Sequence, residues 1–308
     1  MAAEDPAARH ERAGSLSIFL DQASRALANV PILFRDIGLE MVSDTVNYLA
    51  SLVGMLPELW SAFPALERFR AAVLSAMTRE DFLLPRDLLE RIYRSHMACE
   101  MGIEEIQETL EQEIHEMEGT LDREAGRLLA DRPWPEALEG ISVPDMGKGE
   151  VIGQYRDEVE RLAHHCLERR WISSEQLSAC PVTVAPMPAF LSAIRSASSY
   201  SIPPGHPPSG GIFYAIDSHA SQGEDHRECP MLSAHETYPG HHLLDVSRWS
   251  LQRSYRRAVE QPIFYEGWAC FAEELMRLTG YFRGPADRLL LARRRLWRAV
   301  REEVTTGA

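Results

Sequence analysis

The chain has 308 residues, of which 45% are hydrophobic and 25% are charged, enough apolar material for one large domain or two smaller lobes. A formal net charge of −14 argues against a nucleic-acid partner, because binding of nucleic acid needs a basic face. No run of about 18 or more apolar residues is present, so no membrane-spanning helix and no membrane partner are expected.

The five cysteines are odd in number and form no CxxC pair, which is typical of reduced thiols rather than of a disulfide framework. The N-terminal sequence MAAEDPAARHERAGS lacks the basic and apolar regions of a secretory signal. Together these features predict a cytoplasmic protein.

Along the chain, residues 1–14 are polar and are expected to form a mobile N-terminus. Residues 15–130 carry apolar side chains at three- and four-residue spacing, which predicts a helical scaffold lobe. Gly102 is expected to separate two of its helices. Residues 131–150 are rich in proline and glycine, and we place there the boundary with a second lobe, residues 131–308.

The second lobe begins with a predicted helix over Val151–Arg170. Val182–Ala185 is β-branched and bounded by prolines, which favours a short strand at the edge of a sheet. Ser198–Gly210 is rich in Pro, Gly and Ser and predicts a loop, whereas Gly211–Ile216 predicts a second strand. Phe264–Leu278 predicts a helix that is buried on several sides. The predicted fold class is therefore mostly α (α+β), with a small sheet.

The stretch HETYPGHH, residues 235–242, places three imidazoles and one carboxylate within eight residues. In the zinc-peptidase motif HExxH, two histidines four residues apart face one ion from a straight helix. Here Pro239 stands where the second histidine is expected, and His241 and His242 would lie roughly 9 and 10.5 Å beyond His235 on a straight helix. That separation is too long for joint coordination, because Zn–N bonds are about 2.0–2.1 Å.

Pro239 and Gly240 suggest how the histidines meet. Proline removes a backbone donor and clashes with the carbonyl four residues back, which belongs to His235, and glycine tolerates unusual dihedral angles. We expect a kink or bulge here that brings His241 or His242 back beside His235. His241 needs the smaller correction and is favoured, but both histidines remain candidate metal ligands.

Two acidic residues complete the predicted centre. Glu236 follows the first ligand and can reach a water beside the ion, so it is the candidate general base and acid. Glu266 lies among aromatic residues, where an unpaired carboxylate is costly, so it is the candidate third ligand; the alternative is a carboxylate that stabilises a helix N-terminus. Glu273 and Glu274 compete with Glu266 for this place; Glu273 lies about two turns further along the same face, where it would instead support a ligand. This donor set favours one Zn²⁺ ion, with manganese and cobalt as alternatives.

The segments HETYPGHHLL, YEGWACFAEEL, GGIFYAI and MGIEEIQETLEQEIHEME resemble DUF885, a bacterial family of uncharacterised proteins, over roughly residues 36–300. Members of this family look like gluzincin metallopeptidases. The resemblance implies a mostly helical, gluzincin-like fold with a small β-sheet beside the metal cleft. It implies a metal-and-base set of His235, Glu236, one or both of His241 and His242, and Glu266.

The same resemblance implies that an edge strand binds the backbone of the substrate, with Val182–Ala185 and Gly211–Ile216 as the candidate strands. Family members usually continue beyond the segment similar to Leu296–Arg301 with a further helical region, which we expect to be absent here. Its absence predicts uncovered apolar surface, and hence a partner or an oligomer.

The sequence therefore predicts a zinc-dependent hydrolase whose partner is a peptide or small amide substrate. Two alternatives are an amide or ester hydrolase of secondary metabolism that uses the same site, and a truncated binding paralogue without catalysis. Tyr214, Tyr238, Tyr265 and His219 are candidate donors to the oxyanion of the reaction. Tyr214 and Tyr265 are also the candidate substrate-binding residues.

Overall fold

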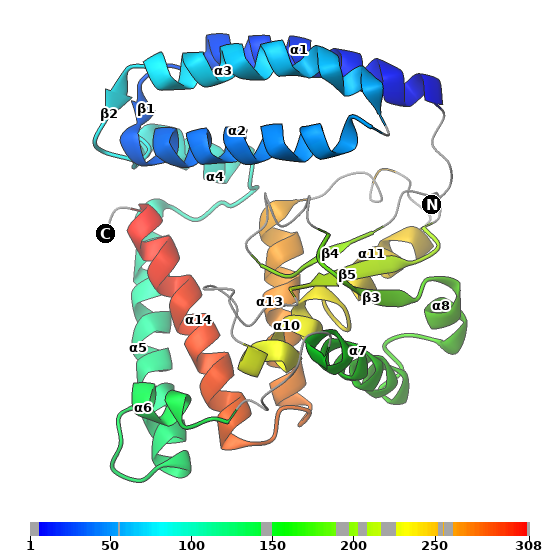
Figure 1. Cartoon of the computed structure of the whole chain (residues 1–308). Coiled ribbons are helices and arrows are strands. Elements are labelled where there is room, and N and C mark those ends of the chain that lie inside the picture. The colour runs from blue at the N-terminus through cyan, green and yellow to red at the C-terminus, as the bar shows by residue number, and fades with distance from the viewer. Residues whose placement is uncertain are drawn as a thin grey trace. The chain divides into compact units, whose positions relative to one another are not determined.

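The computed structural model describes residues 6–54, 56–142, 150–188, 197–202, 208–216, 226–251, 255 and 261–306. The chain forms two compact units, the first comprising Met1–Leu83 and Pro188–Ser196 and the second comprising Leu84–Met187 and Ala197–Ala308. Helices make up most of both units and the strands are short (Figure 1). The predicted mostly α (α+β) class is therefore confirmed.

The first unit is a small helical layer with its own core. Its elements are α1 (Pro6–Ala26), β1 (Val30–Pro31), α2 (Ile32–Leu52), the 3-10 helix η1 (Pro57–Ala62), α3 (Phe63–Ser75) and β2 (Thr78–Arg79). The two strands pair in parallel. Apolar side chains from α1, α2, η1 and α3 form the core, namely Leu20, Leu49, Leu59, Ala62, Ala65 and Leu66.

The N-terminal residues differ from expectation. Residues 6–14, predicted to be a mobile N-terminus, form the first turns of α1. Ala, Arg and Glu are strong helix formers, and Pro6 stands at the first helical position, where its missing N–H breaks no bond.

The second unit carries the remaining helices. They are α4 (Arg86–Ser95), α5 (Ile103–Leu128), α6 (Trp134–Glu139), α7 (Glu150–Glu168), α8 (Ser174–Ala179), the 3-10 helix η2 (His226–Glu228), α10 (Cys229–Glu236), α11 (His241–Ser250), α13 (Pro262–Leu278) and α14 (Pro285–Thr306). Gly102 caps the start of α5, so the predicted break between α4 and α5 is confirmed.

The division into units does not coincide with the predicted boundary near residue 130. Helix α5 was assigned to the first lobe, but it packs along α14 in the second unit. Two ion pairs fasten the helices to each other: Arg295 Nε lies 2.7 Å from Glu113, and Arg288 Nε lies 2.9 Å from Glu124. Packing between segments distant in the chain cannot be read from local composition. The proline- and glycine-rich segment therefore did not mark the boundary between the units.

A three-stranded sheet lies in the second unit. Its strands are β3 (Val182–Pro186), β4 (Ser199–Ser201) and β5 (Gly211–Ala215), in the order β3-β5-β4. β3 runs parallel to β5, and β4 runs antiparallel to it with Tyr200 opposite Phe213. The edge position predicted for β3 is confirmed, whereas β4 falls in a segment predicted to be a loop. Because β5 is the central strand, it has no free edge to offer a substrate.

The core of the second unit extends from the sheet through α7 and α10 to α5, α6 and α14. Helix α7 packs on β3 and on α10, and α10 in turn packs on α13. The rings of Tyr155 on α7 and Phe213 on β5 meet edge to face, with centroids 5.3 Å apart, and both side chains are fully buried. This packing fixes α10, α13 and the sheet around one point, where the sequence motifs meet.

Candidate metal centre

The histidine motif spans the junction of two helices rather than a bulge within one. Helix α10 ends at Glu236, and α11 begins at His241. In the turn between them, the amide of Gly240 donates to the carbonyl of Ala234 across 3.0 Å, and the amide of Leu243 donates to Thr237 across 3.2 Å. The predicted irregularity at Pro239 and Gly240 is therefore present as a complete break between helices.

Gly240 is required by the closeness of this turn. A Cβ atom at that position would lie 1.8 Å from the carbonyl oxygen of His235 and 2.4 Å from that of Ala234. No side chain fits there without moving the backbone, so only glycine allows the chain to pass so close to the end of α10.

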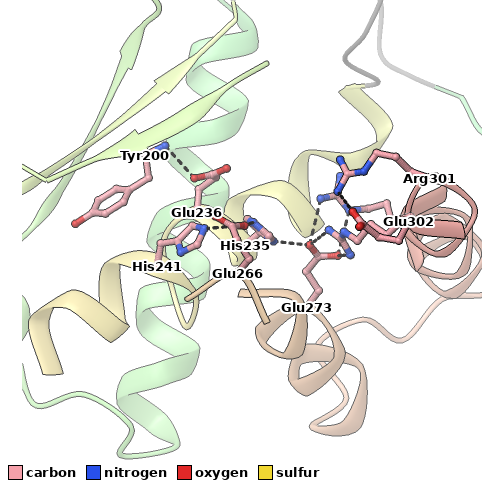
Figure 2. A network of polar contacts seen from close by, with 10 residues as sticks. Tyr200, His235, Glu236, His241, Glu266, Glu273, Arg301 and Glu302 are labelled. Atoms are coloured by element: carbon pink, nitrogen blue, oxygen red, sulfur yellow. Dashed lines mark hydrogen bonds and ion pairs between the residues drawn. The ribbon is translucent and has the colours of Figure 1, made fainter. Parts of the chain in front are cut away.

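His235, His241 and Glu266 converge at this junction. Each of them offers a ligand atom, and these atoms all lie within 4.8 Å of one another. The Nε2 atoms of His235 and His241 are each 3.6 Å from Oε2 of Glu266. The two imidazole rings are almost perpendicular, with centroids 4.9 Å apart (Figure 2). Residues from α10, α11 and α13 are thus brought to one point.

Glu266 approaches the histidines from the first turns of α13. Its side chain keeps 62% of its surface exposed, whereas those of His235 and His241 keep 11% and 6%. The centre is therefore open on the side of Glu266 and closed on the side of the histidines. Contacts with His235 and then His241 hold the pKa of Glu266 well below its usual range, so this carboxylate is ionised at neutral pH.

A buried carboxylate supports His235 from behind. Oε1 of Glu273 lies 2.8 Å from Nδ1 of His235, which leaves Nε2 of the ring directed at the centre. Glu273 is fully buried, and Arg294 and Arg298 on α14 pair with it. Burial alone would raise the pKa of Glu273, but Arg294, His235 and Arg298 hold it well below its usual range. The predicted supporting place of Glu273 agrees with these contacts.

Opposing influences act on the pKa of His235. Burial alone would lower its pKa, but contacts with Glu266 and Glu273 raise the pKa to about 9. The imidazole thus sits between two carboxylates, an environment that suits a cation. A divalent ion on Nε2 would take the place of the proton there, while Glu273 continues to accept from Nδ1.

His242 does not join the cluster, although it was a candidate ligand. Its side chain is fully buried, with Nε2 2.8 Å from the carbonyl oxygen of Cys180 and Nδ1 3.0 Å from the phenol of Tyr200. A carbonyl only accepts, so Nε2 carries the hydrogen and Nδ1 accepts from the phenol. Burial lowers the pKa of His242 to about 4, which keeps the ring neutral. Of the two alternatives left open by the sequence, the structure brings His241 to the centre.

Glu236 lies beside the cluster but outside it. Its Oε2 atom accepts a hydrogen bond of 2.9 Å from the backbone amide of Tyr200 on β4 (Figure 2). Burial raises the pKa of Glu236, although His235 and His241 act in the opposite direction. The carboxylate is therefore held by the sheet, next to the ligands supplied by the helices.

The predicted oxyanion donors are spread around the centre. The ring of Tyr265 stacks on His241 with centroids 4.2 Å apart, and its phenol donates to Asp245 across 3.2 Å. Tyr238 is buried with its ring edge to face with that of His242. Side chains alternate between the two faces of the sheet along β5, so Tyr214 lies on the face opposite to Gly211 and Phe213. His219 lies outside the described residues.

Sequence reasoning missed Tyr200, which binds Glu236 through its amide and His242 through its phenol. It stands among serines, glycines and prolines, where periodicity carries no signal. The repeated aromatic and β-branched character of SYSI is the one local hint of a strand there.

The donor atoms fit a catalytic zinc site. Two imidazole nitrogens and one carboxylate oxygen match the protein ligands of such sites, which leave a further position for water or substrate. The second nitrogen of His235 donates to a carboxylate, as metal-bound histidines commonly do. Of the histidines in the motif, His242 has both ring nitrogens occupied by protein groups, which excludes it from the donor set.

Comparison with known proteins assigns the family. The profile of DUF885, a bacterial protein of unknown function, matches residues 47–307. The chain belongs to this family. The membership confirms the resemblance to DUF885 predicted from the sequence, and the matched range contains every residue of the centre. No functionally curated protein shows significant sequence similarity to this member.

Two solved structures share the fold of this DUF885 member. A provisionally named lipoprotein from Colwellia psychrerythraea is 18% identical, with a TM-score of 0.60 over 82% of this chain and 44% of its own. A provisionally named lipoprotein of unknown function from Shewanella oneidensis is 13% identical, with a TM-score of 0.63 over 92% of this chain and 58% of its own. The chain thus spans about half the length of these structures. Within its described residues, none of the helices combines the length and apolarity that crossing a membrane requires.

Proposed function

We propose that the chain is a zinc-dependent hydrolase of peptide or amide bonds. The observation that carries the proposal is the convergence of His235, His241 and Glu266, whose ligand atoms lie within 4.8 Å of one another. Glu236 stands beside them as the remaining carboxylate, which is the group that hydrolysis by activated water needs for its protons.

Each residue has a distinct part in this proposal. His235, His241 and Glu266 would hold the ion, and Glu273 keeps the ring of His235 in the orientation that presents Nε2. A bound zinc ion supplies a Lewis acid for the carbonyl and lowers the pKa of a water to about 7. Glu236 accepts a proton from the attacking water and delivers it to the leaving amine.

The raised pKa of Glu236 suits this exchange of protons. A general base transfers protons most effectively when its pKa lies close to the working pH, and burial moves that of Glu236 upwards. Its Oε2 atom is occupied by the amide of Tyr200, so Oε1 is the oxygen left to take the proton.

The sheet favours an extended substrate. β4 pairs only with β5 among the described residues, and it lies directly beside Glu236. An extended peptide can add to such an outer strand through main-chain hydrogen bonds, here through groups of β4 other than the amide of Tyr200, which Glu236 binds. This strand replaces the two that the sequence suggested, since β5 is central and β3 follows Pro181 and ends at Pro186. The predicted cytoplasmic location stays a prediction.

The test is a comparison of zinc-loaded wild type, Glu236→Gln and Glu274→Gln on a library of peptides, small amides and esters. Glu274 lies on the same helix as Glu266 but pairs with Arg277, so its variant is the matched control. We expect Glu236→Gln to keep its zinc and to lose turnover by about two orders of magnitude or more, while Glu274→Gln retains both. Wild-type turnover in Glu236→Gln would refute the proposed base, and turnover of esters alone would assign a non-peptide substrate.

A further inference from the structure

His242 contacts strands β4 and β5 and the segment that leads into β3. Its Nε2 atom donates to the carbonyl of Cys180, at the entry to β3, across 2.8 Å. Its Nδ1 atom accepts from the phenol of Tyr200 on β4 across 3.0 Å. On the central strand β5, a Cβ atom built on Gly211 would lie 2.7 Å from Nδ1 of His242, so the backbone of that strand passes directly against the ring.

This close approach depends on the absence of a side chain at Gly211. The same hypothetical Cβ atom would also lie 2.6 Å from Cε2 of Tyr200. The imidazole and the phenol therefore fill together the space that any other residue at position 211 would occupy. Both rings are in edge-to-face contact, with centroids 5.5 Å apart.

Tyr200 links His242 to Glu236, the proposed general base. Its phenol binds His242, and its backbone amide donates to Oε2 of Glu236 across 2.9 Å. β4 is the outer strand, and the amide of Tyr200 points to Glu236 rather than to β5. A continuous chain of hydrogen bonds thus runs from the carbonyl of Cys180 through His242 and Tyr200 to the carboxylate of Glu236.

We propose that His242 and Tyr200 are positioning residues that fasten strand β4 to helix α11 and thereby hold the carboxylate of Glu236 beside the metal centre. The adjacent histidines of the motif then have separate tasks: His241 faces the ion, and His242 faces the sheet. The claim about geometry stands on the contacts alone, whereas its consequence for turnover rests on the proposed function.

A buried imidazole suits this task better than an apolar side chain. An apolar residue could fill the volume, but it could not bind both the carbonyl of Cys180 before β3 and the phenol of Tyr200 on β4. The fully buried ring satisfies both partners, which would otherwise be left without a hydrogen bond. A general base must also be held close to its productive position, because small displacements cost large factors in rate.

The first test is hydrogen exchange of the backbone amide of residue 200, measured on the zinc-loaded full chain. The variants are Tyr200→Phe, which removes one oxygen atom, and His242→Ala. The matched control is Tyr281→Phe, which also removes a phenol hydrogen bond, to Glu158 at 2.8 Å, away from the sheet. We expect exchange of this amide to accelerate roughly fivefold or more in the first two variants, the effect of losing a typical hydrogen bond, and to stay at the wild-type rate in the control.

The second test separates positioning from ligation and from general packing. We expect His242→Ala and Tyr200→Phe to retain wild-type zinc content, and their kcat to fall roughly 10-fold to 100-fold with KM unchanged. His242→Gln, which can both donate and accept, is expected to recover part of kcat and of the amide protection. If His242→Ala fails to fold, Tyr200→Phe decides the matter.

Three results would overturn the inference. Unchanged exchange of the residue 200 amide in Tyr200→Phe would show that the phenol does not hold the strand. Equal acceleration in Tyr281→Phe would show a general loss of stability, and loss of zinc in His242→Ala would make His242 a ligand. If the wild type itself binds no zinc, the proposed function fails while the exchange experiment still reports on the strand.

Discussion

Trp268 donates its indole N–H to the carbonyl oxygen of Pro239 across 2.9 Å. This bond joins helix α13, which carries Glu266, to the turn that separates His235 from His241. The acidic ligand and the two histidines come from different helices, so their distances depend on how α13 is seated against that turn. The bond gives the motif EGW a physical meaning: the glutamate faces His235 and His241, and the tryptophan sets the position of its helix.

The indole bond can be tested through metal affinity. We expect Trp268→Phe to fold but to bind zinc roughly 10-fold to 100-fold more weakly, as losses of groups that orient ligands commonly do. Competition with a fluorescent chelator measures the affinity. Trp297→Phe is the control, because Trp297 is 61% exposed on α14 and contacts Arg301. Equal affinities in wild type and Trp268→Phe would show that the bond is dispensable.

The assignment of Glu266 as a ligand predicts a clear difference between two acidic residues of α13. We expect Glu266→Ala to lose stoichiometric zinc, because two imidazoles alone hold the ion poorly. Glu274→Ala is expected to retain it, since Glu274 pairs with Arg277. Zinc content after dialysis measures both. Full zinc in Glu266→Ala would exclude the assignment.

Removal of the charge on Glu273 tests the buried network behind His235. Glu273→Gln can still accept from Nδ1 of His235, but it removes the charge that pairs with Arg294 and Arg298, of which Arg294 keeps its second partner, Glu228. Loss of one partner of a buried ion pair costs about 3–5 kcal/mol, so we expect the free energy of unfolding in urea to fall by about that amount.

A second variant separates the charge of Glu273 from its hydrogen bond to His235. Glu273→Ala also removes the acceptor for His235, and we expect its zinc affinity to fall roughly tenfold below that of Glu273→Gln. Identical zinc affinities in the two variants would mean that the bond to Nδ1 does not orient the ring.

Two Gly→Ala substitutions are expected to have opposite effects, one in the turn between α10 and α11 and the other in helix α7. Gly240→Ala brings a Cβ atom against the carbonyl of His235, so we expect it to move the turn and abolish zinc binding. Gly153 on α7 has no atom within 4 Å of the corresponding position, and Gly153→Ala is expected to raise stability by about 0.5–1 kcal/mol. Thermal unfolding and zinc titration measure both; zinc binding by Gly240→Ala at wild-type affinity would contradict the described turn.

Local pattern was enough to predict several parts of this protein. The periodicity of α5, α7 and α13 gave their approximate limits, and the proline-bounded segment before Pro186 gave the edge strand β3. The pair Pro239 and Gly240 indicated a kink or bulge that brings distant imidazoles together, because both residues act on the backbone directly; the structure has a break between two helices there.

The remaining features depend on contacts between distant segments. Neighbouring positions in the motif do not reveal that His241 meets Glu266 while His242 meets Cys180 and Tyr200. That choice is made by the direction of α11 relative to the sheet. β4 was not predicted for the same reason. Its three residues lie in a segment rich in turn formers and become a strand only because they pair with β5.

The most direct test of the account is elemental analysis of the purified wild-type chain and of His241→Ala, after loading with zinc and desalting. The account predicts about one zinc ion per chain in the wild type, the occupancy of a single catalytic site, and none above background in His241→Ala. Equal zinc content in the two proteins, or no zinc in the wild type, would contradict the metal centre on which the proposed hydrolysis depends.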